Sequence, residues 1–259
     1  MKKEISKFSF YSPQFSVSKI DNFKETSDRI DSEMKSKLET YFTETDNHIS
    51  LENFDYITKQ LGNDKLAEVY QMLGPFDYNS WSEAKEDADE EADEDLEEKR
   101  IPQEEWMVRK SGAQYRGEVS AENLRPDGKG IKVHQGRSVY EGYFKDGYCH
   151  GFGRGISAAG EIYQGGFNED EMEGKGFFVW PDGKIYEGDW QTNMKHGKGT
   201  YYWPNGQIYQ GDFKNDQCFG IGILYYPDGK RFEGVWKDGK KHGKGYYVFP
   251  NGSMYQVVY

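Results

Sequence analysis

The sequence lacks the long apolar runs that membrane-spanning helices need. Its mean hydropathy is −0.96, and no stretch approaches the ~20 apolar residues of a transmembrane helix. Residues Met1–Ser6 also lack the apolar stretch of a secretory signal. We therefore expect a protein that is made and kept in the cytoplasm.

The sequence also lacks a basic excess. The net charge is −12, and it is unevenly placed, because residues 115–259 carry 18 basic and 18 acidic side chains. The acidic surplus lies before residue 115, so two regions of different character meet near residue 110. Binding to a nucleic-acid backbone depends on neutralising phosphates, so we expect no nucleic-acid partner.

Aromatic residues and glycine, by contrast, are abundant and periodic. An aromatic-x-Gly-x-aromatic motif recurs every 23 residues, and from Tyr140 onward a Gly-x-Gly follows each opening aromatic by 11 residues. A period this strict predicts an array of one supersecondary unit. The opening aromatics are Tyr115, Tyr140, Tyr163, Tyr186, Tyr209 and Phe232, the first of them 25 residues before the second.

Each unit is predicted to be a β-hairpin. Thr200–Trp203 are strand formers, and Pro204-Asn205-Gly206 has the composition of a tight turn. After this turn, Tyr209, Gly211 and Phe213 share one face of the following strand. The polar segment 214–219 is expected to be a surface loop. Head-to-tail hairpins then give an antiparallel sheet roughly 60 Å long at ~4.8 Å per strand.

The repeat phase also decides the state of the two cysteines. Cys149 and Cys218 are the only ones, and they are three repeats apart. That is roughly 29 Å along the array, whereas a disulfide needs Cα atoms within about 7 Å. We expect two free thiols, as in a reducing compartment.

These motifs over residues 115–259 resemble the MORN repeat. The resemblance implies a binding or scaffolding module, as in radial-spoke head proteins of cilia and other cytoskeletal scaffolds, and no enzyme domain accompanies it. We therefore expect a non-catalytic scaffold in the axoneme of a cilium or flagellum or in another cytoskeletal assembly. The first copy departs most, because Val119 replaces its second aromatic and Pro126-Asp127-Gly128 lies out of phase with the later turns.

The expected fold class is α+β with three regions. Residues 1–78 form a helical region, 79–110 an acidic linker or helix, and 111–259 the sheet of six repeats and a terminal strand. Helical periodicity is found in residues 18–42, in Ser50–Gly62 and in Lys65–Leu73, the last of these ending at Gly74-Pro75.

Leu38–Gly62 resembles a degenerate EF-hand. Aligning Ile49 on the eighth loop position puts Phe42 first and Asn53 twelfth, where a working calcium loop has Asp and a bidentate Glu. We expect no calcium binding, and a plain helical hairpin is the alternative. Glu83–Glu98 contains 11 acidic residues and is interpreted as a linker, with docking on a basic surface as the alternative.

The aromatic ladder is the candidate site for a protein partner, because Tyr and Trp supply large, rigid contact surfaces. The alternative is that the rings pack against one another along the sheet, and both can hold. The candidates are Tyr140, Phe144, Tyr163, Phe167, Tyr186, Trp190, Tyr209, Phe213, Phe232 and Trp236.

Basic residues near one edge of the sheet suggest a second candidate. They could bind anionic phospholipid at ~1 kcal/mol each, which makes a peripheral membrane tether the alternative function. Against a continuous stripe, Glu169–Glu173 occupy the same phase with opposite charge. The candidate lipid-binding residues are Lys195, Lys198, Lys240, Lys241 and Lys244.

No catalytic, metal or cofactor site is expected. His150, His196 and His242 share one phase of the repeat and are roughly 19 Å apart from one to the next, too far to share a metal ion. The Gly-x-Gly pairs are not followed by a helix that could bind phosphate. We therefore expect a protein that is not an enzyme.

Overall fold

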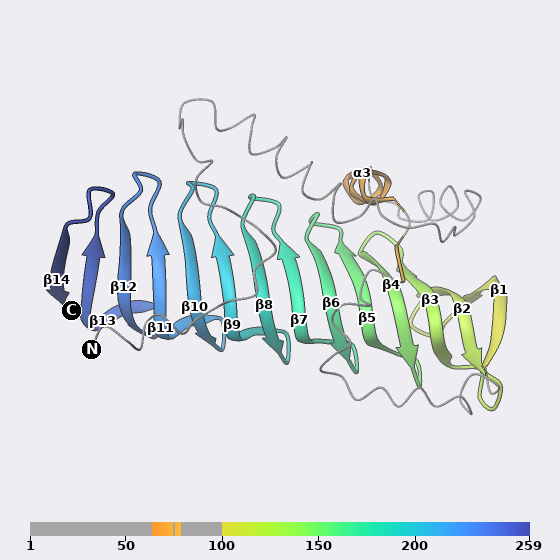
Figure 1. The fold of residues 1–259 in the computed structure, drawn as a ribbon. Helices are drawn as coiled ribbons and strands as arrows, with labels where there is room; N and C mark the ends of the chain where they lie inside the picture. The colour runs from red at the N-terminus through yellow and green to blue at the C-terminus, as the bar shows by residue number, and fades with distance from the viewer. Residues whose placement is uncertain (1–63, 75, 79–99) are drawn as a thin grey trace.

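The computed structural model describes residues 64–74, 76–78 and 100–259 (Figure 1). They form one helix, α3 (Asp64–Leu73), and a single antiparallel sheet of 14 strands paired in chain order. Within these residues, no helix has the length and apolar character to cross a membrane. The prediction of one long hairpin sheet is confirmed.

The sheet is a meander in which every strand pairs with its neighbours in the chain. The six repeats supply β2 to β13, and β14 is the predicted terminal strand. The strands are β1 (Arg100–Val108), β2 (Gln114–Ser120), β3 (Pro126–His134), β4 (Ser138–Lys145), β5 (Tyr148–Ser157), β6 (Ile162–Asn168), β7 (Glu171–Val179), β8 (Ile185–Gln191), β9 (Met194–Tyr202), β10 (Ile208–Lys214), β11 (Gln217–Tyr225), β12 (Arg231–Lys237), β13 (Lys240–Val248) and β14 (Met254–Val258).

Two kinds of turn alternate along the array. The predicted Pro-Asx-Gly turn joins β9 to β10, where the Asn205 side chain accepts a hydrogen bond from the Gln207 amide at 3.1 Å. The second kind joins β10 to β11 through Asn215 and Asp216, whose φ angles are +48° and +68°. The surface loop predicted at 214–219 is therefore a two-residue turn, because Asn and Asp tolerate the left-handed region that such a turn requires.

A bulge follows this turn in each of the later repeats. Gly211 pairs with Gly222, but the next residue, Asp212, pairs with Phe219, so β11 contains two more residues than β10 here. Gly220 adopts φ +61° in the bulge, and the Asp212 carboxylate accepts a hydrogen bond from the Ile221 amide at 3.1 Å. The first glycine of each Gly-x-Gly thus belongs to a bulge.

The second glycine of each Gly-x-Gly makes room for an aromatic ring, which is a tyrosine in every repeat but the last. We call the side of the sheet that carries Tyr209, Gly211 and Phe213 face A, and the opposite side face B. The Tyr209 ring lies over the cross-strand pair Gly211 and Gly222, where an added Cβ would meet its atoms at 2.4–2.7 Å. The Tyr209 hydroxyl donates to the Asp212 carbonyl at 3.0 Å. Only glycine at both positions leaves space for this ring.

Helix α3 packs on face B over β5, and it confirms the helix predicted at 65–73. Leu66, Tyr70 and Leu73 are buried in a cluster with aliphatic side chains of β3 to β7. The Tyr70 hydroxyl donates to Glu141 at 2.6 Å, and Glu141 pairs with Arg154 at 2.5 Å.

A buried ion pair is strongly destabilised when one partner is removed. Arg154 also donates to the Gly74 carbonyl at 2.7 Å, which fixes the end of the helix to the sheet.

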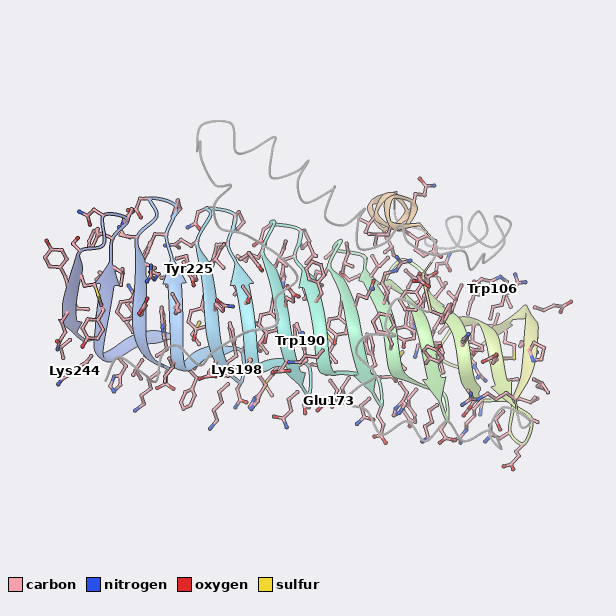
Figure 2. All side chains as sticks on the ribbon, in the orientation of Figure 1. Trp106, Glu173, Trp190, Lys198, Tyr225 and Lys244 are labelled. Atoms are coloured by element: carbon pink, nitrogen blue, oxygen red, sulfur yellow. The ribbon has the colours of Figure 1, made fainter. Side chains whose placement is uncertain are left out.

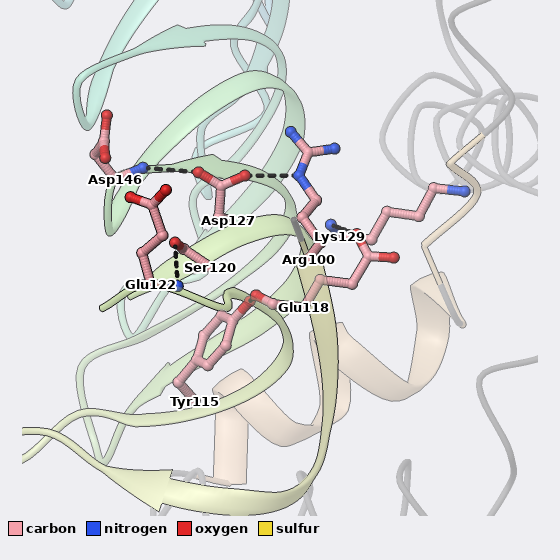
Figure 3. A network of polar contacts seen from close by, with 8 residues as sticks. All are labelled: Arg100, Tyr115, Glu118, Ser120, Glu122, Asp127, Lys129 and Asp146. Atoms are coloured by element: carbon pink, nitrogen blue, oxygen red, sulfur yellow. Dashed lines mark hydrogen bonds and ion pairs between the residues drawn. The ribbon is translucent and has the colours of Figure 1, made fainter. Parts of the chain in front are cut away.

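The sheet begins earlier than the sequence predicts. Strand β1 lies in the segment assigned to the acidic linker, and its sequence carries no repeat motif. Arg100 of β1 reaches Asp127 of β3 at 2.6 Å, and the Glu118 carboxylate accepts from the Lys129 amide at 2.6 Å (Figure 3). The second contact joins β2 to β3, whereas β1 itself is held by backbone pairing, by Arg100 and by the partly buried Trp106 and Met107.

The first repeat, which departs most from the motif, also differs in where its Pro-Asp-Gly lies. Pro126-Asp127-Gly128 is the start of β3 and not a turn, and Gly130 pairs with Gly117 in the position of the later Gly-x-Gly glycines. The other N-terminal predictions, namely the helices at 18–42 and 50–62, the EF-hand-like segment Leu38–Gly62 and the linker at 79–99, lie outside the described residues.

The glycine pair gives a direct test of the fold. We expect Gly222→Ala to lower the free energy of unfolding by about 1–3 kcal/mol, because its Cβ would overlap the Tyr209 ring. Thermal unfolding followed by circular dichroism measures the change. Gly155→Ala is the matched control, because its Cβ would meet only an ordinary contact with Phe167 at 3.9 Å. Equal melting temperatures for the two variants would contradict the assignment.

Candidate functional site

The predicted aromatic ladder forms one continuous chain of edge-to-face contacts on face A. Each tyrosine meets the aromatic four residues later on its own strand and the corresponding aromatic of the next repeat. Tyr186, for example, contacts Trp190 at 5.2 Å and Phe213 at 5.0 Å between ring centroids. Such pairs add about 0.5–1.5 kcal/mol each beyond their buried area.

The structure places almost all of the ladder in the core. Tyr186, Tyr209 and Phe232 have no exposed surface, and only Phe167 is half-buried. The structure therefore shows the alternative to partner binding, in which the rings pack against one another along the sheet. Contact of these rings with a partner stays a prediction. The buried members are Tyr140, Phe144, Tyr163, Tyr186, Trp190, Tyr209, Phe213, Phe232 and Trp236.

Beside the ladder lies a second row of aromatic side chains that are half-buried. Trp180 and Tyr201 have ring centroids 5.7 Å apart, and Tyr201 and Trp203 are 4.6 Å apart. Tyr226 and Tyr247 continue the row at 6.3 Å. We call these five residues the A-face row. Partial exposure leaves them available for contact in a way that the ladder is not.

The A-face row follows a pattern in the sequence. Trp180, Trp203 and Tyr226 each stand immediately before the proline of a Pro-Asx-Gly turn. The earlier repeats carry His134 and Ser157 at this phase, so the row is confined to the later repeats. An aromatic residue recurring just before a turn proline was the available signal.

Two of the predicted lipid-binding lysines lie within the A-face row. Lys195 is 5.4 Å from the Trp180 ring centroid and pairs with Asp216 at 2.6 Å. The Lys241 ammonium donates to the hydroxyls of Tyr226 and Tyr247, each at 2.7 Å. Burial works against its charge, but these hydrogen bonds prevail and raise the pKa of Lys241. The row therefore holds two fixed cations.

The five lysines do not form one surface. Lys195 and Lys241 face side A, whereas Lys198 and Lys244 pair in register with side-B residues. Lys198 forms an ion pair with Asp212, and Lys240 is exposed at the start of β13. Figure 2 shows Glu173, Lys198 and Lys244 along the lower edge of the sheet. Lipid binding stays a prediction, and a continuous basic stripe is not what the structure presents.

Both cysteines are free thiols on face A, as expected from the repeat phase. Cys149 is buried, which raises its pKa far above the usual range. Burial also raises the pKa of Cys218 to about 11. Neither thiol is poised as a nucleophile at neutral pH, because the thiolate is the reactive form. Among the described residues, no group of three His, Cys, Asp or Glu side chains gathers as a metal site.

Comparison with known families assigns the repeat. Five segments of the chain match the MORN repeat. They are residues 140–154, 163–185, 186–208, 209–231 and 232–254. The MORN repeats thus account for β4 to β13, with the unmatched residues 155–162 inside that range, and the divergent first copy lies outside the match. A search of curated proteins found no match.

Two solved structures are similar over part of the sheet. The SAS-4 (dCPAP) TCP domain of Drosophila melanogaster, in complex with a proline-rich motif of Ana2, is 13% identical. The match covers 60% of this chain and 89% of that domain, with a TM-score of 0.37. The G-box domain of the microcephaly protein CPAP is 13% identical over 60% of this chain and 92% of its own, with a TM-score of 0.30. These scores are too low to carry a partner over to this chain.

The burial of the ladder predicts its contribution to stability. We expect Tyr209→Ala to cost about 3–5 kcal/mol, because it leaves a cavity between the paired glycines. Tyr209→Phe should cost only about 1 kcal/mol, the net value of the hydroxyl hydrogen bond. Urea unfolding measures both. A Tyr209→Ala protein as stable as wild type would show that the ring is not part of the core.

The thiols give a prediction on pH. At pH 8 a thiol of pKa about 11 carries on the order of a hundredfold less thiolate than an ordinary cysteine of pKa about 8.5. We expect Cys218 to react slowly with a disulfide reagent in the folded protein, and its rate to rise with pH up to about 11. Cys149 should be slower still. Protein unfolded in denaturant is the control, and rapid native reaction at pH 8 would contradict the burial.

Proposed function

We propose that the chain is a non-catalytic scaffold that binds a protein partner along the A-face row. The observation that carries this proposal is the row itself, five half-buried aromatic side chains that run beside a fully packed ladder. Aromatic rings that are ordered before binding supply contact area at little entropic cost. The MORN repeats, a non-enzymatic repeat family, support the scaffold role.

The chemistry of the row suggests the kind of partner. Lys195 on β9 and Lys241 on β13 are four strands apart, which is ~19 Å at ~4.8 Å per strand. A segment that places apolar side chains over the rings and carboxylates at that separation would complement both features. The partner is therefore proposed to be an acidic, apolar protein segment in extended or helical form.

A cytoskeletal location, in a ciliary axoneme of radial-spoke type, is part of the proposal and rests on the MORN resemblance alone. Imaging of tagged protein tests it, and a signal spread through the cytoplasm with none on the axoneme would reject it. The membrane-tether alternative is weaker, because the candidate lysines are divided between the two faces of the sheet.

Substitutions in the A-face row test partner binding. We expect Trp180→Ala with Trp203→Ala to reduce recovery of bound proteins from a cytoskeletal extract at least about tenfold, since hot-spot tryptophans contribute 2 kcal/mol or more. Tyr225→Ala, an aromatic of similar burial on face B, is the matched control and should leave recovery unchanged.

Two outcomes would contradict this proposal. Equal loss in both variants would show that the effect is structural and not a property of the row. Flotation of the wild-type protein on anionic vesicles at physiological salt, abolished by replacing Lys195 and Lys241, would favour the membrane tether.

A further inference from the structure

Face B carries a row of cross-strand pairs with one pair per repeat boundary. Each pair joins the middle residue of a Gly-x-Gly to the residue just before the second aromatic of the next repeat. These pairs occupy equivalent positions in the repeat. A difference in side-chain type between two pairs therefore indicates a difference in what contacts that part of face B. In chain order they are Lys129–Tyr143, Phe152–Gly166, Lys175–Asp189, Lys198–Asp212 and Ile221–Val235.

The first apolar stretch of this row is covered by the segment that follows α3. Phe76 lies 5.3 Å from Phe152, and Tyr78 lies 5.7 Å from Tyr143, between ring centroids. Phe152 is only 6% exposed as a result. At the two positions where the row carries an aromatic side chain, Tyr143 and Phe152, the Phe-x-Tyr segment after α3 covers it.

The next two pairs are charged and accessible. Lys175 pairs with Asp189 at 2.5 Å, and the Lys175 side chain is 61% exposed. Lys198 and Asp212 form the equivalent ion pair on the next boundary. Face B is exposed to solvent here, because accessible ion pairs of this kind are typical of protein surfaces.

The last pair is apolar again, but no described residue covers it. Ile221 is 63% exposed and Val235 is 41% exposed, and the neighbouring Phe219 and Tyr246 are 42% and 40% exposed. Val235 also replaces the aspartate that caps the bulge in the two preceding repeats. We call these four residues the B-face patch. A contiguous apolar patch in place of an ion pair marks a contact surface.

We propose that the B-face patch is covered by the chain's own Phe8 and Phe10. These residues have the same spacing as Phe76 and Tyr78, which cover the equivalent apolar site three repeats earlier. The two sites are roughly 29 Å apart at ~4.8 Å per strand. Residues 11–63, 53 in number, connect Phe10 to α3, which is ample for this distance even where the connection is helical.

A second segment of the chain has the same aromatic spacing but not the reach. Phe54-Asp55-Tyr56 repeats the sequence of Phe76-Asp77-Tyr78. Only residues 57–63 separate it from α3, so the connection would span ~29 Å only if every residue were fully extended, at ~3.6 Å per residue. Residues Ser50–Gly62 instead have the periodicity of a helix, which leaves Phe8 and Phe10 as the occupant.

Photocrosslinking in the full chain tests the proposal. Ile221 is replaced by p-benzoylphenylalanine, and the crosslinked peptides are mapped by mass spectrometry. We expect crosslinks within one molecule to residues 1–17, and a fall of at least about tenfold, or about 1.4 kcal/mol, in Phe8→Ala/Phe10→Ala. Phe15→Ala is the matched control and should keep the crosslink. The same probe at Lys175, an ion-pair position of the row, should give none.

A second measurement distinguishes release of the segment from misfolding of a variant. Ile221→Lys/Val235→Asp restores the ion pair of the neighbouring repeats, so the sheet should remain as stable as wild type. Tryptic cleavage after Lys7 should become at least about tenfold faster in this variant if the segment is released. Unchanged cleavage, crosslinks between two copies, or crosslinks that survive Phe8→Ala/Phe10→Ala would each overturn the proposal.

Discussion

The structure depends on one steric requirement, the fit of an aromatic ring over two paired glycines. Tyr209 can lie flat on the sheet only because Gly211 and Gly222 face each other across two strands. The ring is then sealed by Phe213 of its own strand and Trp236 of the next repeat. Each repeat therefore completes its core with a residue of its neighbour, so a single hairpin cannot bury its own ring.

As a result of this arrangement, the apolar side chains of the two faces are buried in different ways. Face A is filled by its own aromatic ladder, and needs no second layer. Face B lacks such a ladder, and its apolar side chains are buried where α3 and the segment to Tyr78 cover them. The buried Glu141–Arg154 pair with Tyr70 fixes that cover in one place, because each polar group requires the others. A thin sheet thus acquires a core on one side and a docked helix on the other.

Much of this was predictable from the sequence, since a period of 23 residues fixes the hairpins, the pairing and the free thiols. Other features were not. Strand β1 carries no repeat motif and is held by backbone pairing, by Arg100 and by the partly buried Trp106 and Met107. The turn at Asn215 and Asp216 was expected to be a loop, because polar residues alone do not distinguish a two-residue turn. Lys195 and Lys198, by contrast, are three residues apart on β9, so the alternation of side chains along the strand is enough to place them on opposite faces.

The repeats share one backbone arrangement, so recognition must depend on the few positions of the repeat at which the side chain varies. Before each Pro-Asx-Gly turn the later repeats carry Trp180, Trp203 and Tyr226, whereas the earlier ones carry polar His134 and Ser157. The half-buried aromatic row is thus limited to the later repeats, while α3 covers the opposite face of the earlier ones. A partner on face A of the later repeats would not compete with the helix. The array can therefore bind along its length in segments, each defined by local substitutions on a common frame.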